Sequence, residues 1–93
     1  MKLTKEDKEY LMSVLGEDEH SLNQIEEATT TTKFKMNGKR IGIKKVIELL
    51  GRKQFLSGLD RCAFHFSCTR ETESGEQIHF DNSKMFDMIF GGN

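Results

Sequence analysis

Residues 33–45 read KFKMNGKRIGIKK, and this stretch predicts a β-hairpin. Asn37-Gly38 at its centre is the pair most typical of a two-residue type I′ turn, because both positions of that turn need a positive φ. Apolar and basic residues alternate on both sides of the turn, as expected for two strands with one buried face. Threonines 29–32 extend the first strand, since β-branched residues favour strands, so the hairpin is predicted over residues 30–43.

A two-residue turn also fixes which residues of the two strands face each other. Phe34 is expected opposite Ile41 on the core face, and Lys35 opposite Arg40 on the outer face. Two like charges in direct cross-strand register destabilise a sheet. Because such local conflicts are expected where function outweighs stability, the hairpin is the first candidate for a functional surface.

The remaining chain predicts one α+β domain, residues 1–93, in which a small antiparallel sheet packs against four to five short helices. Alternating apolar and polar residues predict a further strand over residues 77–81. The longest helix is expected over residues 53–69, and Gly58 within it indicates close packing against the sheet. Shorter helices are expected at about residues 4–15, 18–28, 44–50 and 83–90, from the spacing of their apolar residues and from capping residues.

Charge is distributed unevenly along a chain whose formal net charge is −1. Residues 33–53 hold eight Lys or Arg residues and one Glu, whereas residues 1–32 hold three basic and eight acidic residues. A basic block of this density favours an anionic partner. The residues expected to form this partner-binding surface are Lys33, Lys35, Lys39, Arg40, Lys44, Lys45, Arg52 and Lys53.

Three sources of negative charge could face this basic surface. One is a host protein or a protein–nucleic-acid complex, and another is nucleic acid bound directly through its phosphates. The third is the acidic part of the same protein, residues 1–32, within one chain or across a homodimer. Lysines on a strand can also simply keep a sheet soluble, without any partner.

A second, smaller polar patch is predicted on the helix over residues 53–69. Arg61 and His65 are one helical turn apart and therefore share a face, from which they can recognise a carboxylate or phosphate. Cys62, His65 and Cys68 resemble a metal-binding spacing, but on one helix the two cysteines point about 120° apart. We therefore expect no metal and no cofactor.

No pair of side chains in the sequence forms a convincing nucleophile–base or two-carboxylate arrangement, so an enzyme is not expected. The chain has no apolar run of about 18 residues, and its start, MKLTKEDKEYL, lacks the apolar stretch of a signal peptide. We therefore expect a cytoplasmic protein that does not enter membranes. Its two cysteines are expected to be reduced thiols, which agrees with that compartment.

The run ELLGRKQFLSGLDRCAFHFSCTRE over residues 48–71, with LTKEDKEYL over residues 3–11, resembles small accessory proteins encoded by phages and other mobile elements of bacteria. The resemblance covers most of the chain and assigns no role to individual residues. It implies a class of role, since such proteins are often binders without chemistry of their own, among them anti-CRISPR and other anti-defence inhibitors.

The sequence therefore predicts a small non-enzymatic binding protein that inhibits or modulates a host macromolecule through its basic hairpin. The alternative is a small nucleic-acid-binding regulator that uses the same residues. No aromatic side chain is expected among the outward basic residues, because Phe34 points inward, so a base-stacking platform is not predicted.

Overall fold

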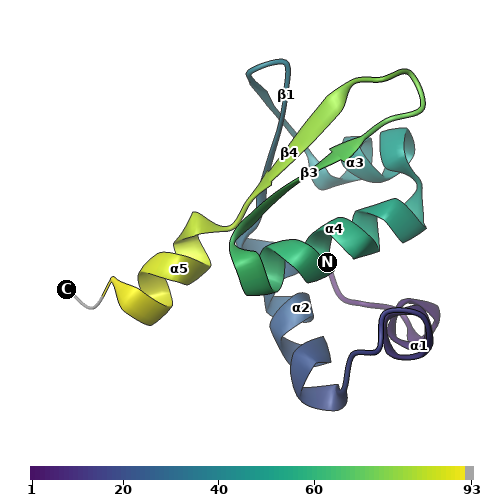
Figure 1. Ribbon diagram of the computed structural model, residues 1–93, viewed down its shortest axis with the longest axis vertical. Coiled ribbons are helices and arrows are strands. Elements are labelled where there is room, and N and C mark those ends of the chain that lie inside the picture. The colour runs from purple at the N-terminus through teal and green to yellow at the C-terminus, as the bar shows by residue number, and fades with distance from the viewer. Residues whose placement is uncertain (92–93) are drawn as a thin grey trace.

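The computed structural model describes residues 1–91, which form an α+β fold of five helices and a four-stranded antiparallel sheet (Figure 1). The fold class is the predicted one. Within these residues, no helix has both the length and the apolar character needed to cross a membrane. The elements follow one another as α1 (Lys5–Ser13), α2 (Glu19–Thr31), β1 (Lys33–Met36), β2 (Lys39–Ile41), α3 (Ile43–Leu50), α4 (Arg52–His65), β3 (Ser67–Glu71), β4 (Gln77–Asp81) and α5 (Ser83–Phe90).

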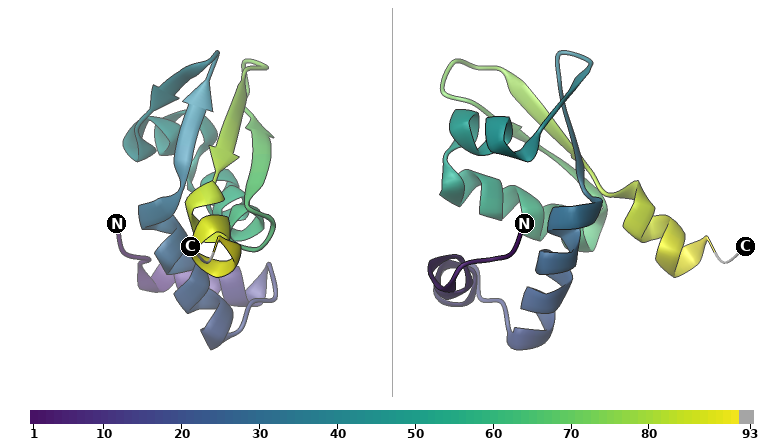
Figure 2. Two further views of the ribbon diagram at one scale, coloured as in Figure 1. Left: turned by 90° about the vertical axis from the view of Figure 1, so that its left-hand side faces the viewer. Right: turned by 180° about the vertical axis from the view of Figure 1, so that it is seen from behind.

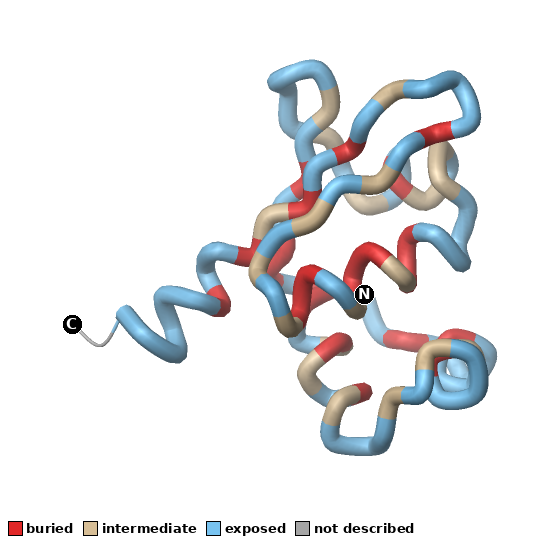
Figure 3. The backbone as a smooth tube through the Cα atoms, viewed as in Figure 1, coloured by how far each residue is buried: buried red, intermediate tan, exposed pale blue. Residues whose placement is uncertain are grey.

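The sheet has the strand order β2–β1–β4–β3, so two hairpins are joined through the pairing of β1 with β4. Helices α3 and α4 cover one face of the sheet, and the other face has no helix over it (Figure 2). Helices α1 and α2 pack on the far side of α4. The central helix α4 therefore packs against both the sheet and the N-terminal helices, and many of its residues are buried (Figure 3).

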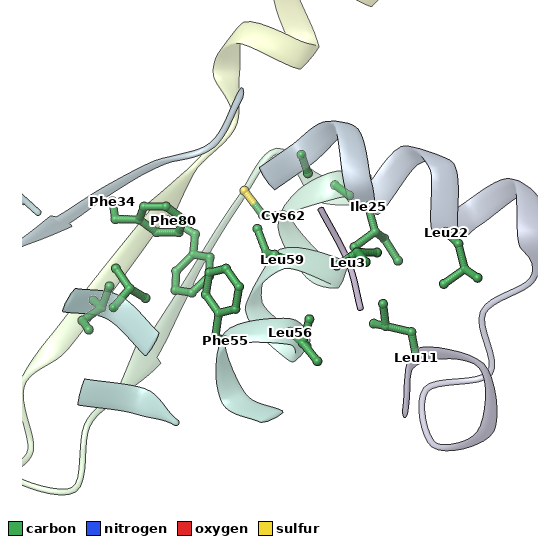
Figure 4. Close-up of a cluster of buried hydrophobic side chains, with 14 residues drawn as sticks. Leu3, Leu11, Leu22, Ile25, Phe34, Phe55, Leu56, Leu59, Cys62 and Phe80 are labelled. Carbon is green, nitrogen blue, oxygen red and sulfur yellow. The ribbon is translucent and has the colours of Figure 1, made fainter. Parts of the chain in front are cut away.

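The core between α4 and the sheet is built from aromatic rings around Phe80, which is fully buried (Figure 4). Its ring meets that of Phe34 edge-to-face at a centroid distance of 5.0 Å, and Phe55 of α4 lies 6.5 Å away. Gly58 lets α4 approach this cluster, because a Cβ atom there would overlap the Phe80 ring. The predicted close packing at Gly58 is confirmed.

The predicted hairpin over residues 30–43 is too long at both ends. Threonines 29–31 continue α2, and β1 starts only at Lys33. The hydroxyl groups of Thr29 and Thr30 donate to backbone carbonyls one turn earlier, at Glu26 and Glu27. Threonine can be accommodated in a helix in this way, so here the helix prevails over β propensity. At the other end, β2 stops at Ile41.

The predicted helix over residues 53–69 is also wrong at its end, and a strand was missed. Helix α4 ends at His65, because Phe66 adopts a left-handed conformation with φ 67°. The chain then turns back as β3 and pairs with β4, so the sheet has four strands in the described residues instead of three. Phe66 fits the helical spacing, but its ring packs on Phe86 and Phe90 of α5.

The substitution Gly58→Ala tests whether the approach of α4 to Phe80 limits stability. Alanine would raise helix propensity by about 1 kcal/mol, but its methyl group must displace a buried ring, at a cost of about 1–3 kcal/mol or more. We expect a lower free energy of unfolding in urea. An unchanged or higher stability for Gly58→Ala would refute the steric argument.

Candidate functional site

The basic hairpin has the turn and the register that the sequence predicts. Asn37 and Gly38 both have positive φ, 54° and 77°, as a type I′ turn requires. The strands pair Phe34 with Ile41 and Lys35 with Arg40. The cross-strand pair of like charges is therefore present. The Asn37 side-chain amide donates to Glu76 Oε2 at 3.1 Å, which ties this turn to the segment that leads into β4.

Strand β1 is an inner strand, so the cations of the hairpin extend into a row across the sheet. Lys35 lies between Arg40 on β2 and His79 on β4, and all three side chains are exposed. Two residues before Lys35 on β1, Lys33 faces Asp81. We use the name open sheet face for the outward side chains of the four strands, which are Lys33, Lys35, Arg40, Ser67, Thr69, Glu71, Gln77, His79 and Asp81.

His79 is a contributor to this row that the sequence analysis missed. It pairs with Lys35 on one side and with Thr69 on the other, and its Nδ1 lies 3.5 Å from Thr69 Oγ1. The alternation over residues 77–81 placed His79 outward, but its position beside Lys35 depends on the pairing of β1 with β4. That pairing joins segments far apart in the chain.

The start of α3 adds further cations next to the hairpin. Gly42 is the N-cap of α3, and no side chain caps this helix end. Lys44 and Lys45 lie in its first turn, both exposed, and this turn contains no acidic residue. Cations at the positive end of a helix dipole are unfavourable, so a second local conflict lies next to the like-charge pair of the hairpin. An anion bound here would contact both the ammonium groups and the free backbone N–H groups.

The other predicted cations lie away from the open sheet face. Lys39 is opposite Met36 in the register, so its side chain leaves the sheet on the opposite side from Lys35. Arg52 and Lys53 begin α4 and line a small depression together with residues of α1. The hairpin and the start of α3 are thus one continuous stretch of chain, whereas Arg52 and Lys53 belong to the contact between α1 and α4.

The acidic helices do not neutralise the hairpin. Among residues 1–91 there is a single salt bridge, and it joins Arg52 to Asp7. Neither Lys35 nor Arg40 has a carboxylate within salt-bridge distance in this part of the chain. The acidic residues among 1–32 of the same chain therefore do not form ion pairs with the hairpin.

Arg52, predicted to bind a partner, holds α1 against α4. Its Nε donates to Asp7 Oδ1 at 2.7 Å and its Nη2 to Asp7 Oδ2 at 2.6 Å. Asp7 is nearly buried and also closes the capping box of α1, where it accepts from the Thr4 backbone N–H. Chiefly because of the hydrogen bonds from Arg52, the pKa of Asp7 lies below its ordinary value. No local sequence signal links two residues 45 positions apart.

We expect Asp7→Asn to reduce stability most at neutral pH. A carboxyl group whose pKa is lowered in the folded state stabilises the protein above its unfolded pKa, and this contribution disappears as the pH falls through the folded pKa. Arg52 is 41% exposed, so solvent screens the pair and a loss of about 1–2 kcal/mol is expected at pH 7. Urea unfolding from pH 7 down to about pH 3 would measure this.

Glu9→Gln is the matched control for this ion pair. Glu9 lies on the same helix, is exposed, and its side chain has no hydrogen bond or salt bridge in the described residues. The free energy of unfolding of Glu9→Gln should differ little from that of the wild type over the same pH range. A loss in Asp7→Asn that is independent of pH would show that the charge of Asp7 is not what stabilises this contact.

The predicted polar patch of Arg61 and His65 exists, but it contains carboxyl groups that were not anticipated. Both residues are exposed and line a shallow depression of about 290 Å³ together with Glu17, Ser21, Asp60 and Phe64. Burial, and after it the proximity of the Glu17 carboxyl group, raises the pKa of Asp60 to about 7. Asp60 Oδ1 is buried and has no hydrogen-bond partner. This patch is therefore of mixed charge.

We expect Asp60→Asn to become more stabilising as the pH rises. A raised pKa means that the folded protein binds more protons than the unfolded protein between about pH 4 and about pH 7. Wild-type stability should therefore fall across this window, and a neutral amide would remove the effect. At pH 8 the variant should unfold at a higher urea concentration than the wild type. A difference that stays constant between pH 4 and pH 8 would contradict the assignment.

The two cysteines do not form a reactive or metal-binding centre. Cys62 is fully buried on α4, where burial raises its pKa to about 12, and Cys68 lies on β3. Cys68 Sγ donates to the Gly58 carbonyl at 3.3 Å, so it contributes to the α4–sheet contact. Throughout residues 1–91, no three His, Cys, Asp or Glu side chains are grouped so that they could hold a metal ion.

Comparisons of the chain with protein-family models, with curated proteins and with solved structures found no match.

Proposed function

We propose that this is a non-enzymatic binding protein that holds an anionic macromolecular surface on its open sheet face. The row of Arg40, Lys35 and His79 carries the proposal, because the two cations Arg40 and Lys35 lie side by side on adjacent strands, His79 lies beside Lys35 on the third strand, and neither cation has a salt bridge within residues 1–91. Adjacent like charges raise the free energy of the unbound sheet. A bound anionic surface would remove this repulsion, so the binding energy includes relief of a conflict within the protein.

The partner that we propose is an acidic surface of a host protein or of a protein–nucleic-acid complex, which the small protein inhibits or modulates by covering it. The open sheet face has no Phe, Tyr or Trp side chain, because Phe34 and Phe80 point into the core. Recognition of unstacked bases usually needs such rings. The inhibitory role in this proposal is supported by the resemblance of the sequence to accessory proteins of phages and mobile elements.

The second candidate is a small regulator that binds nucleic acid directly. One observation favours it: the start of α3, with Lys44, Lys45 and an uncapped helix end, follows the hairpin without a break. Backbone N–H groups and lysines together are typical of phosphate contacts. This candidate predicts binding that is insensitive to base sequence and that weakens steeply with salt.

The decisive experiment compares the partner affinity of two variants, one with reversed charges on the open sheet face and one with the same number of reversed charges on α1. Lys35→Glu/Arg40→Glu changes the open sheet face, and Lys5→Glu/Lys8→Glu makes the same change of net charge on exposed positions of α1. We expect the hairpin variant to lose at least about tenfold in affinity, and the α1 variant to lose little. Affinity would be measured by pull-down from host lysate, followed by titration of the retained partner.

Fluorescence titrations against duplex and single-stranded DNA and RNA separate the two candidates. Flat titrations at low salt, together with a protein partner lost only in the hairpin variant, would support the inhibitor. A salt-dependent affinity for nucleic acid alone would favour the regulator. Equal losses in both variants, or no partner of either class for the wild type, would reject the open sheet face as the binding surface.

A further inference from the structure

His79 lies on an inner strand of the open sheet face, beside the cations of the hairpin. In the register of β1, β4 and β3 it is directly between Lys35 and Thr69, and its side chain is exposed. Directly opposite residues on neighbouring strands have Cβ atoms about 4.5–5.5 Å apart, so His79 continues the row that Arg40 and Lys35 begin. A proton on its ring turns two adjacent positive charges into three.

The neighbour of His79 on β3 is compatible with both charge states of the ring. The Nδ1 atom of His79 lies 3.5 Å from Thr69 Oγ1, which is a long contact. A hydroxyl group can donate to a neutral ring nitrogen and can accept from a protonated one. Because the ring is also exposed, it can exchange its proton with solvent without losing this contact.

The charges that face His79 come from the strands on both sides of it and from its own strand. Lys35 is its direct neighbour on β1, and Lys33 is the next residue of β1 on the same face. Glu71 of β3 and Asp81 of β4 are the nearest carboxylate positions in the register. Helices α3 and α4 cover the opposite face of the sheet, so their charges do not face the ring (Figure 2). Two cations and two carboxylates thus surround the ring on the open sheet face.

Protonation of His79 and binding of an anionic surface are coupled. Histidine is the side chain whose charge ordinarily changes between about pH 5 and pH 8, whereas lysine and arginine stay charged throughout that range. A third positive charge in the row strengthens the attraction of an anionic surface. By linkage, the bound surface favours the protonated ring to the same extent.

We propose that His79 makes the open sheet face a pH-dependent binding surface, which holds an acidic polypeptide more tightly when the ring is protonated than when it is neutral. This inference rests on the proposed function and adds its regulation. Affinity is highest at mildly acidic pH and falls as the pH rises, and Lys35 and Arg40 provide the binding that remains. A lysine at position 79 would instead add a second pair of like charges to the free sheet at every pH.

Titration of the full chain with fluorescently labelled poly-L-aspartate tests this coupling, since aspartate side chains stay ionised between pH 6 and pH 8. The Kd is measured at pH 6, 7 and 8 at the same low salt concentration, because salt screens exposed charges. We expect the Kd of the wild type to rise about two- to fivefold from pH 6 to pH 8, which is the effect of one exposed ion pair.

The matched variants are His79→Gln and His65→Gln. His79→Gln keeps a polar side chain beside Lys35, and its Kd should stay near the wild-type value at pH 8 over the whole range. His65 is also exposed but lies on α4, so His65→Gln should keep the wild-type pH dependence. Because the pKa of Asp60 is about 7, that side chain also changes charge in this window, but it lies on α4 and is present in both variants.

Calorimetry measures the coupled proton directly. Titration with poly-L-aspartate at pH 6.5, in two buffers of different ionisation enthalpy, should show that the wild type takes up protons when it binds. His79→Gln should take up fewer protons, and His65→Gln should take up as many as the wild type. Equal proton uptake by the wild type and His79→Gln would contradict the proposal.

The remaining outcomes separate this inference from the proposed function. A wild-type Kd that is constant from pH 6 to pH 8, or a His79→Gln variant with the full pH dependence, would overturn the role of His79 and leave the open sheet face as a binding surface. No binding of poly-L-aspartate at pH 6, or equal binding by the wild type and Lys35→Glu/Arg40→Glu, would count against both. Binding of duplex DNA but not of poly-L-aspartate would overturn the acidic polypeptide as the ligand.

Discussion

The close approach of α4 to the sheet at Gly58 and Phe80 is the constraint on which the rest of the structure depends. Without a side chain at Gly58, the Phe80 ring lies directly on the helix backbone, and Cys68 of β3 donates to the carbonyl of the same glycine. This contact commits one face of the sheet to the core. Because side chains alternate along a strand, the opposite face is then fixed as the surface on which the hairpin presents Lys35 and Arg40.

Where the sequence alone predicted the structure, the interactions that decide it are local. The Asn37-Gly38 turn fixes the register of the two strands beside it, so the pairing of Lys35 with Arg40 was predictable from the local sequence. The missed strand β3 depends instead on Phe66, which leaves the helical conformation to pack on rings about twenty residues later in the chain. Periodicity carries no information about such contacts, which explains why α4 was predicted too long.

The same division holds for the candidate site. The density of cations on the hairpin is a property of the sequence, and the structure places His79 beside them by pairing β1 with β4. The removal of Arg52 from the candidate surface follows from Asp7, and the altered chemistry around Arg61 follows from Glu17 and Asp60. In each case at least one deciding partner, such as Asp7 for Arg52 and Glu17 for Asp60, is distant in the chain. Charge sign could therefore be predicted, but charge compensation could not.

The distance between the basic hairpin and the acidic helices α1 and α2 also determines the electrostatic potential that an approaching partner meets. The protein measures 36 × 34 × 19 Å, and along its longest axis the hairpin tip and the start of α2 lie at opposite ends (Figure 1). At physiological ionic strength electrostatic interactions are screened beyond about 8 Å. A partner near Arg40 therefore interacts with the cations of the hairpin and hardly with the acidic residues of α1 and α2. The acidic residues of α1 and α2 therefore contribute little to the potential at the hairpin, where the nearer carboxylates are those of Glu76 at the turn and Asp81 opposite Lys33.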